Sequence, residues 1–175
     1  MNPLKSLFFA ETLRRWHFEV ILKESGLSRE RVYHFLKELQ KEDFIKRIKP
    51  KGKMPYYLAH RESHKFRIEK RMYGLKILEN LFSHISECKN IKTAILFGSF
   101  ANGNWNKSSD IDLFLYGKDN EFNKAKFELE LGRDIQLFSY KNQQKIILEP
   151  AVISNIIKGF HITQSIEPFE VKMHA

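Results

Sequence analysis

The stretch FGSFANGNWNKSSDIDLFLY, residues 97–116, decides the fold of the second half of the chain. It passes from an apolar residue through Gly, Ser and Asn, and then places Asp110 and Asp112 one residue apart before a second apolar run. Alternate residues of a β-strand lie on one face, so the two aspartates are expected to share a face while Ile111 and Leu113 share the other. Two carboxylates so close repel each other, and a bound cation would offset that repulsion. The pattern therefore predicts a strand that is buried on one face and binds a metal on the other.

Further strands and helices alternate around this stretch. Apolar runs predict strands at 93–97, 111–116 and 134–140 and an extended segment at 160–163, and helical periodicity predicts helices at 121–132 and 147–159. Strands separated by helices indicate an α/β (α+β) domain with a small mixed sheet and flanking helices.

The first part of the chain has a different pattern. A helix is predicted over 16–24, Gly26 can form a turn, and Ser28 is a good N-cap for a second helix. Apolar residues recur on one face of that second helix, at Val32, Leu36 and Leu39. Two extended segments, 44–48 and 56–59, flank the basic turn KPKGKMP. This order predicts an N-terminal winged helix-turn-helix, with the helix after Ser28 as recognition helix and the basic turn as wing.

Basic charge is concentrated in this first part. Residues 1–71 contain 18 Lys and Arg against nine Asp and Glu, whereas residues 72–175 contain 12 of each kind. A basic domain attracts polyanions, nucleic acid first among them. The predicted nucleic-acid contacts lie on the recognition helix and the wing: Arg29, Arg31, His34, Lys37, Lys49, Lys51 and Lys53. The sequence leaves open whether this domain binds DNA, RNA or a protein, or whether its charge only serves solubility.

A long helix, predicted over 61–87 with a wide apolar face and Gly74 near its middle, joins the two parts. We therefore expect a winged helix-turn-helix at 1–60, a connecting helix at 61–88 and an α/β domain at 89–175.

Other classes of protein are not indicated. No apolar run is long enough to span a bilayer, and the N-terminal patch LFFA is too short for a signal peptide, so we expect it in the core of the first helix. Cys88 is the single cysteine, and the seven His residues show no metal-ligand spacing. A cytoplasmic protein without a membrane partner is the expectation, and its oligomeric state stays open.

The residues around the two aspartates form a longer pattern. Gly, Ser, Ala and Gly at 98, 99, 101 and 103 are followed by five residues and then by SDIDL at 109–113. This arrangement resembles the signature of the polymerase-beta-like nucleotidyltransferase superfamily over sixteen positions. The whole chain, with a winged helix before a minimal nucleotidyltransferase domain, is similar to a group of small archaeal proteins. The catalytic domain alone also resembles the antitoxin halves of toxin–antitoxin pairs, which transfer a nucleotide to a partner toxin.

The resemblance implies an enzyme that moves a nucleoside monophosphate from an NTP, with ATP as the expected donor, to a hydroxyl of an acceptor. It implies that Gly98, Ser99 and Ser109 bind the nucleotide and that Asp110 and Asp112 bind Mg²⁺ or Mn²⁺. The acceptor could be a partner protein such as a toxin. The alternative is a DNA-binding regulator whose nucleotidyltransferase fold senses a nucleotide or holds a partner.

The family's third carboxylate has no unique counterpart here. Asp134 is our choice as metal ligand and acceptor of the substrate proton, but some members would align their carboxylate with Gln136, and Glu149 is a weaker substitute. Asn102 stands where many members carry Arg. Trp105, in the polar loop, could stack on a base, although packing over the loop is the expected role.

Overall fold

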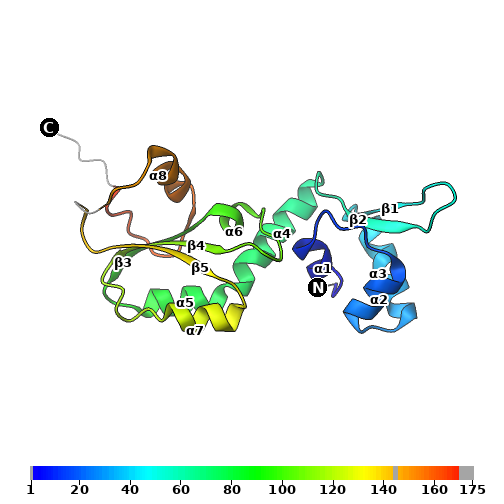
Figure 1. The fold of residues 1–175 in the computed structure, drawn as a ribbon, viewed down its shortest axis with the longest axis horizontal. Coiled ribbons are helices and arrows are strands. Elements are labelled where there is room, and N and C mark those ends of the chain that lie inside the picture. The colour runs from blue at the N-terminus through cyan, green and yellow to red at the C-terminus, as the bar shows by residue number, and fades with distance from the viewer. Residues whose placement is uncertain (1, 144–145, 170–175) are drawn as a thin grey trace. The chain divides into compact units, whose positions relative to one another are not determined.

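The computed structural model describes residues 2–143 and 146–169. They form two compact units, which divide between Lys70 and Arg71 (Figure 1). The division falls inside helix α4 (His64–Ile77), within the segment predicted to connect the two parts. Within the described residues, none of the helices combines the length and apolar character needed to cross a membrane.

The first unit contains three helices and a hairpin. Helix α1 (Lys5–Ala10) is followed by α2 (Phe18–Ser25), α3 (Arg29–Lys41) and the antiparallel strands β1 (Ile45–Ile48) and β2 (Tyr56–Ala59). As predicted, Gly26 ends α2 in the left-handed conformation, and the Ser28 hydroxyl caps α3 by accepting the Arg31 N–H at 3.4 Å. The order of helix, turn, helix and hairpin is confirmed, whereas its identity as a winged helix-turn-helix stays a prediction.

An aromatic cluster holds this unit together. Phe8 and Phe9, from the LFFA patch, are fully buried, which confirms the predicted core role. Phe9 lies 5.4 Å from Phe44 and 5.5 Å from Phe66 between ring centroids, and Phe44 and Phe66 are 4.8 Å apart. These edge-on and tilted contacts join α1, the start of the hairpin and α4.

The single long helix predicted over 61–87 is wrong in one respect. The backbone leaves the helical conformation at Leu78, which separates α4 from α5 (Glu79–Glu87). Leu78, Leu81 and Ile85 are buried, whereas Met72, an apolar residue of the same predicted helix, is 64% exposed. Because the helix is interrupted at Leu78, one helical periodicity cannot describe both segments.

The second unit is built on a four-stranded mixed sheet, in the order β5-β4-β3-β6. Strand β3 (Ile91–Phe97) pairs antiparallel with β4 (Ile111–Gly117) and with β6 (Phe160–His161), and β4 pairs parallel with β5 (Ile135–Tyr140). The connections carry α6 (Gly98–Asn102), α7 (Lys124–Leu131) and α8 (Pro150–Ile157). The predicted small mixed sheet with flanking helices is thus confirmed.

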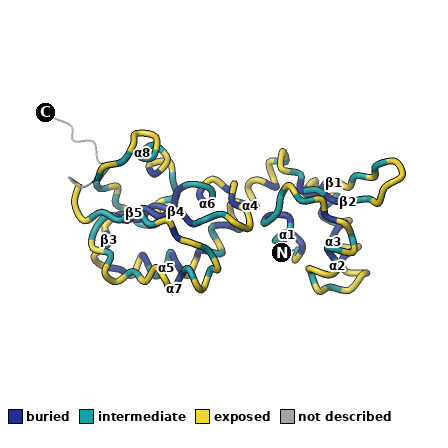
Figure 2. Tube along the Cα trace, viewed as in Figure 1, coloured by how far each residue is buried: buried dark blue, intermediate teal, exposed yellow. Residues whose placement is uncertain are grey.

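Helices cover both faces of the sheet. Figure 1 shows α5 and α7 on one side and α8 on the other. On the α8 side, Ile156 packs with Ile95, Phe97 and Phe114 in one apolar cluster. Strands β3 and β4 are the most deeply buried, as Figure 2 shows. The stretch that carries the two aspartates is therefore anchored in the core of this unit.

Candidate active site

The two aspartates lie where β4 begins. Asp110 immediately precedes the strand, and Asp112 is its second residue, opposite Phe97 at the end of β3. Both aspartates are partly exposed, whereas Ile111 and Leu113 are fully buried. The alternation predicted from the sequence is confirmed: one face of β4 is anchored in the core, and the other presents two carboxylates.

Gly98 places the β3–α6 turn directly against Asp112. Its φ of 67° lies in the left-handed region, and a Cβ at this position would collide with the Asp112 carboxylate. The next residue, Ser99, donates its backbone N–H to the same carboxylate. The turn predicted to hold phosphate is therefore in direct contact with an aspartate predicted to hold metal.

Asp112 is a carboxylate in unfavourable surroundings. Burial raises its pKa above the ordinary value, and the charge of Asp110 raises it further, while the hydrogen bond from Ser99 acts in the opposite direction. A bound cation would offset both unfavourable effects at once. The two aspartates thus favour a positive charge at this face.

The third acidic position is defined by the register of the parallel strands. Asp112 is level with Gln136, and the Ile111 N–H donates to the Asp134 carbonyl at 2.9 Å, so Asp134 flanks Asp110. Both Asp134 and Gln136 are exposed. Asp134 thus flanks one predicted metal-binding aspartate, while an amide lies beside the other. Glu149, the weaker alternative, is exposed and precedes α8.

The donor set suits a hard cation that retains other ligands. Among residues 2–143 and 146–169, no three His, Cys, Asp or Glu side chains gather closely enough to enclose a metal. Two carboxylates on one rigid strand are nevertheless the protein ligands that Mg²⁺ uses when water and substrate phosphates complete its octahedron. Asp110 and Asp112 therefore fit a metal that arrives with a nucleotide.

The loop between α6 and β4 is held by its own contacts. Trp105 is only 2% exposed and stacks on Phe100, with ring centroids 5.4 Å apart and planes 7° apart. Trp105 therefore packs inside the protein, as expected, and is not available to a base. Asn106 Oδ1 accepts from the Ser108 N–H at 2.8 Å, and Ser109 Oγ accepts from the Asn106 N–H at 2.9 Å. Ser109, predicted to bind nucleotide, holds this turn in the structure.

Arg133 is a site residue that the sequence did not reveal. Its Nη1 donates to the Asn106 carbonyl at 2.9 Å and to the Ser109 carbonyl at 2.7 Å. Its guanidinium lies 5.1 Å from the ring centroid of Phe100 and 5.9 Å from that of Trp105. No spacing signal links an arginine to carbonyls 24 and 27 residues earlier in the chain, so these contacts follow only from the fold.

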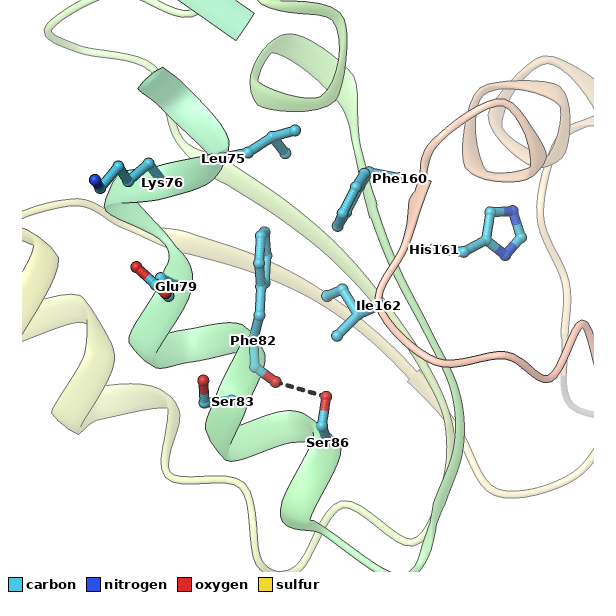
Figure 3. Close-up of a pocket in the computed structure, with 9 residues that line it drawn as sticks. All are labelled: Leu75, Lys76, Glu79, Phe82, Ser83, Ser86, Phe160, His161 and Ile162. Atoms are coloured by element: carbon cyan, nitrogen blue, oxygen red, sulfur yellow. Dashed lines mark hydrogen bonds between the residues drawn. The ribbon is translucent and has the colours of Figure 1, made fainter. Parts of the chain in front are cut away.

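Two hollows of this unit differ in their lining. A polar one of about 330 Å³ is formed by Lys107, Ser108, Ser109, Asp110, Glu128, Gly132, Arg133 and Asp134. A larger one, about 710 Å³, lies between the end of α4, α5 and β6, where Phe82 and Phe160 stack 5.5 Å apart (Figure 3). None of the predicted site residues lines the larger hollow, whereas Ser109, Asp110 and Asp134 share the polar one. The smaller, polar hollow is therefore the better candidate for the site of the reaction.

The seven residues predicted to contact nucleic acid are all exposed in the first unit: Arg29, Arg31, His34, Lys37, Lys49, Lys51 and Lys53. Arg29 is paired with Glu19 at 2.9 Å, and His34 lies 3.1 Å from Glu38. Tyr33, which the sequence did not single out, is 63% exposed beside Arg31, His34 and Lys37 in one hollow of about 600 Å³.

Comparison with known proteins found one family match, which lies within the second unit. Residues 79–159 match the family model described as "Polymerase beta, Nucleotidyltransferase". A crystal structure of a candidate nucleotidyltransferase from Sulfolobus solfataricus was also matched. Its sequence is 17% identical to this chain, the TM-score is 0.30, and the match covers 54% of this chain and 84% of that one. No curated protein matches the chain. The family match supports a nucleotidyltransferase activity in general.

Proposed function

We propose that the second unit transfers a nucleoside monophosphate from an NTP, with ATP as the expected donor, to a hydroxyl of an acceptor. The observation that carries this proposal is the pair Asp110 and Asp112 on one face of β4, in contact with the Gly98–Ser99 turn. The family match over residues 79–159 supports the same reaction class.

In the proposed reaction, the acceptor oxygen forms a bond to the α-phosphorus, and the bond from that phosphorus to the α–β bridging oxygen breaks. Pyrophosphate leaves with those electrons. The acceptor proton passes to Asp134, which shares the polar hollow with Asp110 and is exposed there. The Gly98–Ser99 turn would contact the triphosphate, and the Ser99 hydroxyl is the expected donor to it.

Asp110 and Asp112 would hold the Mg²⁺ or Mn²⁺ ions that accompany the nucleotide. When bound, such ions neutralise phosphate charge and make the acceptor hydroxyl a better nucleophile. The chain's own contribution is rigidity, because the core-facing residues of β4 fix the direction of both carboxylates.

The proposed acceptor is a hydroxyl group. We favour a hydroxyl on a partner protein, which would be modified as in antitoxin-type enzymes. The test is incubation with α-labelled ATP, Mg²⁺, and separate RNA and protein pools, followed by RNase or protease digestion of the labelled product. Label should survive RNase and be lost with protease. Asp112→Asn should reduce transfer at least about 100-fold, because losing a metal ligand costs more than losing its outer-shell support. Equal labelling by wild type and this variant would refute the assignment.

A second function is favoured by the first unit. Its basic residues surround Tyr33 on α3 and continue onto the hairpin turn, which suits a DNA-binding regulator. The variant Arg31→Ala with Lys51→Ala should weaken DNA binding and reduce the slope of log affinity against log salt by about 2. The control, Lys23→Ala with Arg67→Ala, removes the same charge from outside α3 and the hairpin. Absence of DNA binding by the wild type at low salt would exclude this function.

A further inference from the structure

Arg133 joins the two chain segments that carry the acidic residues of the site. It lies in the turn between α7 and β5, where its backbone N–H donates to the Glu128 carbonyl at 3.2 Å. Its side chain reaches the loop before β4 and donates to the carbonyl of Ser109, the residue immediately before Asp110. A single side chain thus fixes the backbone position from which the Asp110 carboxylate projects.

The surroundings of Arg133 restrict it to this geometry. The guanidinium lies over Phe100, which is fully buried and stacks on Trp105. The Glu128 carboxylate holds the following strand by accepting the Ile135 N–H at 2.9 Å. Burial lowers the pKa of Arg133, and the charge of Asp110 acts in the opposite direction, so the guanidinium interacts electrostatically with this aspartate. Stacking, hydrogen bonding and charge therefore converge on one arginine.

We infer that Arg133 is a positioning residue: by clamping the Asn106–Ser109 turn to the start of β5, it orients Asp110 and so sets the affinity of the site for a metal–nucleotide complex. This inference rests on the proposed function, because it assumes that Asp110 contacts the metal. Arg133 would act through Asp110 and not by touching the substrate. Residues that support a metal ligand from behind commonly change metal affinity by about 10- to 100-fold when replaced.

The experiment is calorimetric titration of the whole protein with Mn²⁺ and the α,β-methylene analogue of ATP, which cannot be cleaved between its α- and β-phosphates. Arg133→Gln should weaken binding at least about tenfold. Arg133→Lys keeps the charge but loses the planar stacking surface and should give an intermediate affinity. The matched control Arg71→Gln removes an exposed arginine of the same unit and should bind like the wild type. When EDTA removes the Mn²⁺, the wild type and the three variants should have the same affinity for the analogue.

Other roles for Arg133 give different results. A purely electrostatic role predicts weaker Mn²⁺–nucleotide binding by Arg133→Gln, because the complex is net negative, and unchanged binding by Arg133→Lys, which keeps the positive charge. A purely structural role predicts a lower melting temperature with unchanged affinity. Either result would overturn the inference. If Arg133→Gln does not fold, wild-type affinity in Arg133→Lys would overturn it, and weakened affinity would support it. Equal binding by wild type and Asp112→Asn would instead contradict the proposed function itself.

Discussion

At the scale of single residues, Gly98 determines how closely the turn between β3 and α6 approaches the acidic strand. Its left-handed φ and the space occupied by the Asp112 carboxylate exclude any side chain. We predict that Gly98→Ala costs about 1–2 kcal/mol of stability from backbone strain. It should also lower nucleotidyl transfer about 100-fold, because it displaces Asp112.

The control for this prediction is Gly26→Ala. Gly26 has a φ of 64°, and a Cβ added to it would meet no atom within 4 Å, so the change introduces strain without a collision. Denaturant unfolding should show a loss of stability in both variants, larger in Gly98→Ala because of the collision, while only Gly98→Ala should lose activity. Full activity in Gly98→Ala would show that the contact with Asp112 does not matter for the reaction.

The roles of the two residues beside the aspartates can be tested separately. Asp134 shares the polar hollow with Asp110, whereas Gln136 is level with Asp112 and lies outside the hollow's lining. We expect Asp134→Asn to reduce the transfer rate by about 100-fold, as for loss of a general base. In rate assays at saturating nucleotide, Gln136→Ala should have little effect on the transfer rate. A larger loss in Gln136→Ala than in Asp134→Asn would reverse the assignment.

At the scale of elements, the loop before β4 depends on α4 through Gly74. A Cβ at Gly74 would collide with the Trp105 indole nitrogen. Gly74→Ala should therefore destabilise the second unit by about 1–3 kcal/mol, even though alanine is the better helix former. The double variant with Trp105→Phe should recover part of that loss, because the smaller ring leaves space. Chemical denaturation measures both, and a stabilising Gly74→Ala would contradict the packing described.

Helices α1, α3 and α4 are tied by an ion network. The Lys5 ammonium, on a side chain 9% exposed, lies 2.6 Å from Glu69 and 3.3 Å from Glu42, which also pairs with Lys65 at 3.0 Å. The hydrogen bond from Lys65 lowers the pKa of Glu42 below its ordinary 4.5, with Lys5 acting in the same direction.

A carboxylate whose pKa is lower in the folded state stabilises the fold above its ordinary pKa and loses that contribution as pH falls through the folded value. Glu42→Gln should therefore lower the unfolding free energy by about 0.5–1 kcal/mol at pH 7. The difference from wild type should shrink below about pH 4.5. Urea unfolding at pH 7 and pH 3 tests this, and a difference that grows in acid would contradict it.

Local patterns predicted the elements better than the contacts between them. Alternation along 111–116 predicted the buried and acidic faces of β4, and Ser28 predicted the start of α3, because both signals are carried by neighbouring residues. The break at Leu78 and the clamp made by Arg133 depend on segments distant in sequence, so no periodicity contains them. The burial of Trp105 was expected, but the need for Gly74 beside it was not.

At the scale of the whole molecule, two units of different character are joined in one chain. The first is basic, with exposed cations on α3 and the hairpin, and the second contains the segment that matches nucleotidyltransferases. We propose that the first unit binds nucleic acid and that the second unit transfers the nucleotide. The acidic face of β4 is the feature on which the proposed chemistry depends, because both carboxylates are fixed by the core beneath them.

The decisive experiment for that chemistry is anomalous diffraction from crystals of the full-length protein soaked with Mn²⁺ and the α,β-methylene analogue of ATP. We predict an anomalous peak within about 2.3 Å of carboxylate oxygens of both Asp110 and Asp112, at a distance typical of oxygen ligands to hard divalent cations. The triphosphate should lie against Gly98 and Ser99. Nucleotide bound elsewhere, or an Mn²⁺ peak that contacts neither aspartate, would show that the acidic face of β4 is not the catalytic metal site.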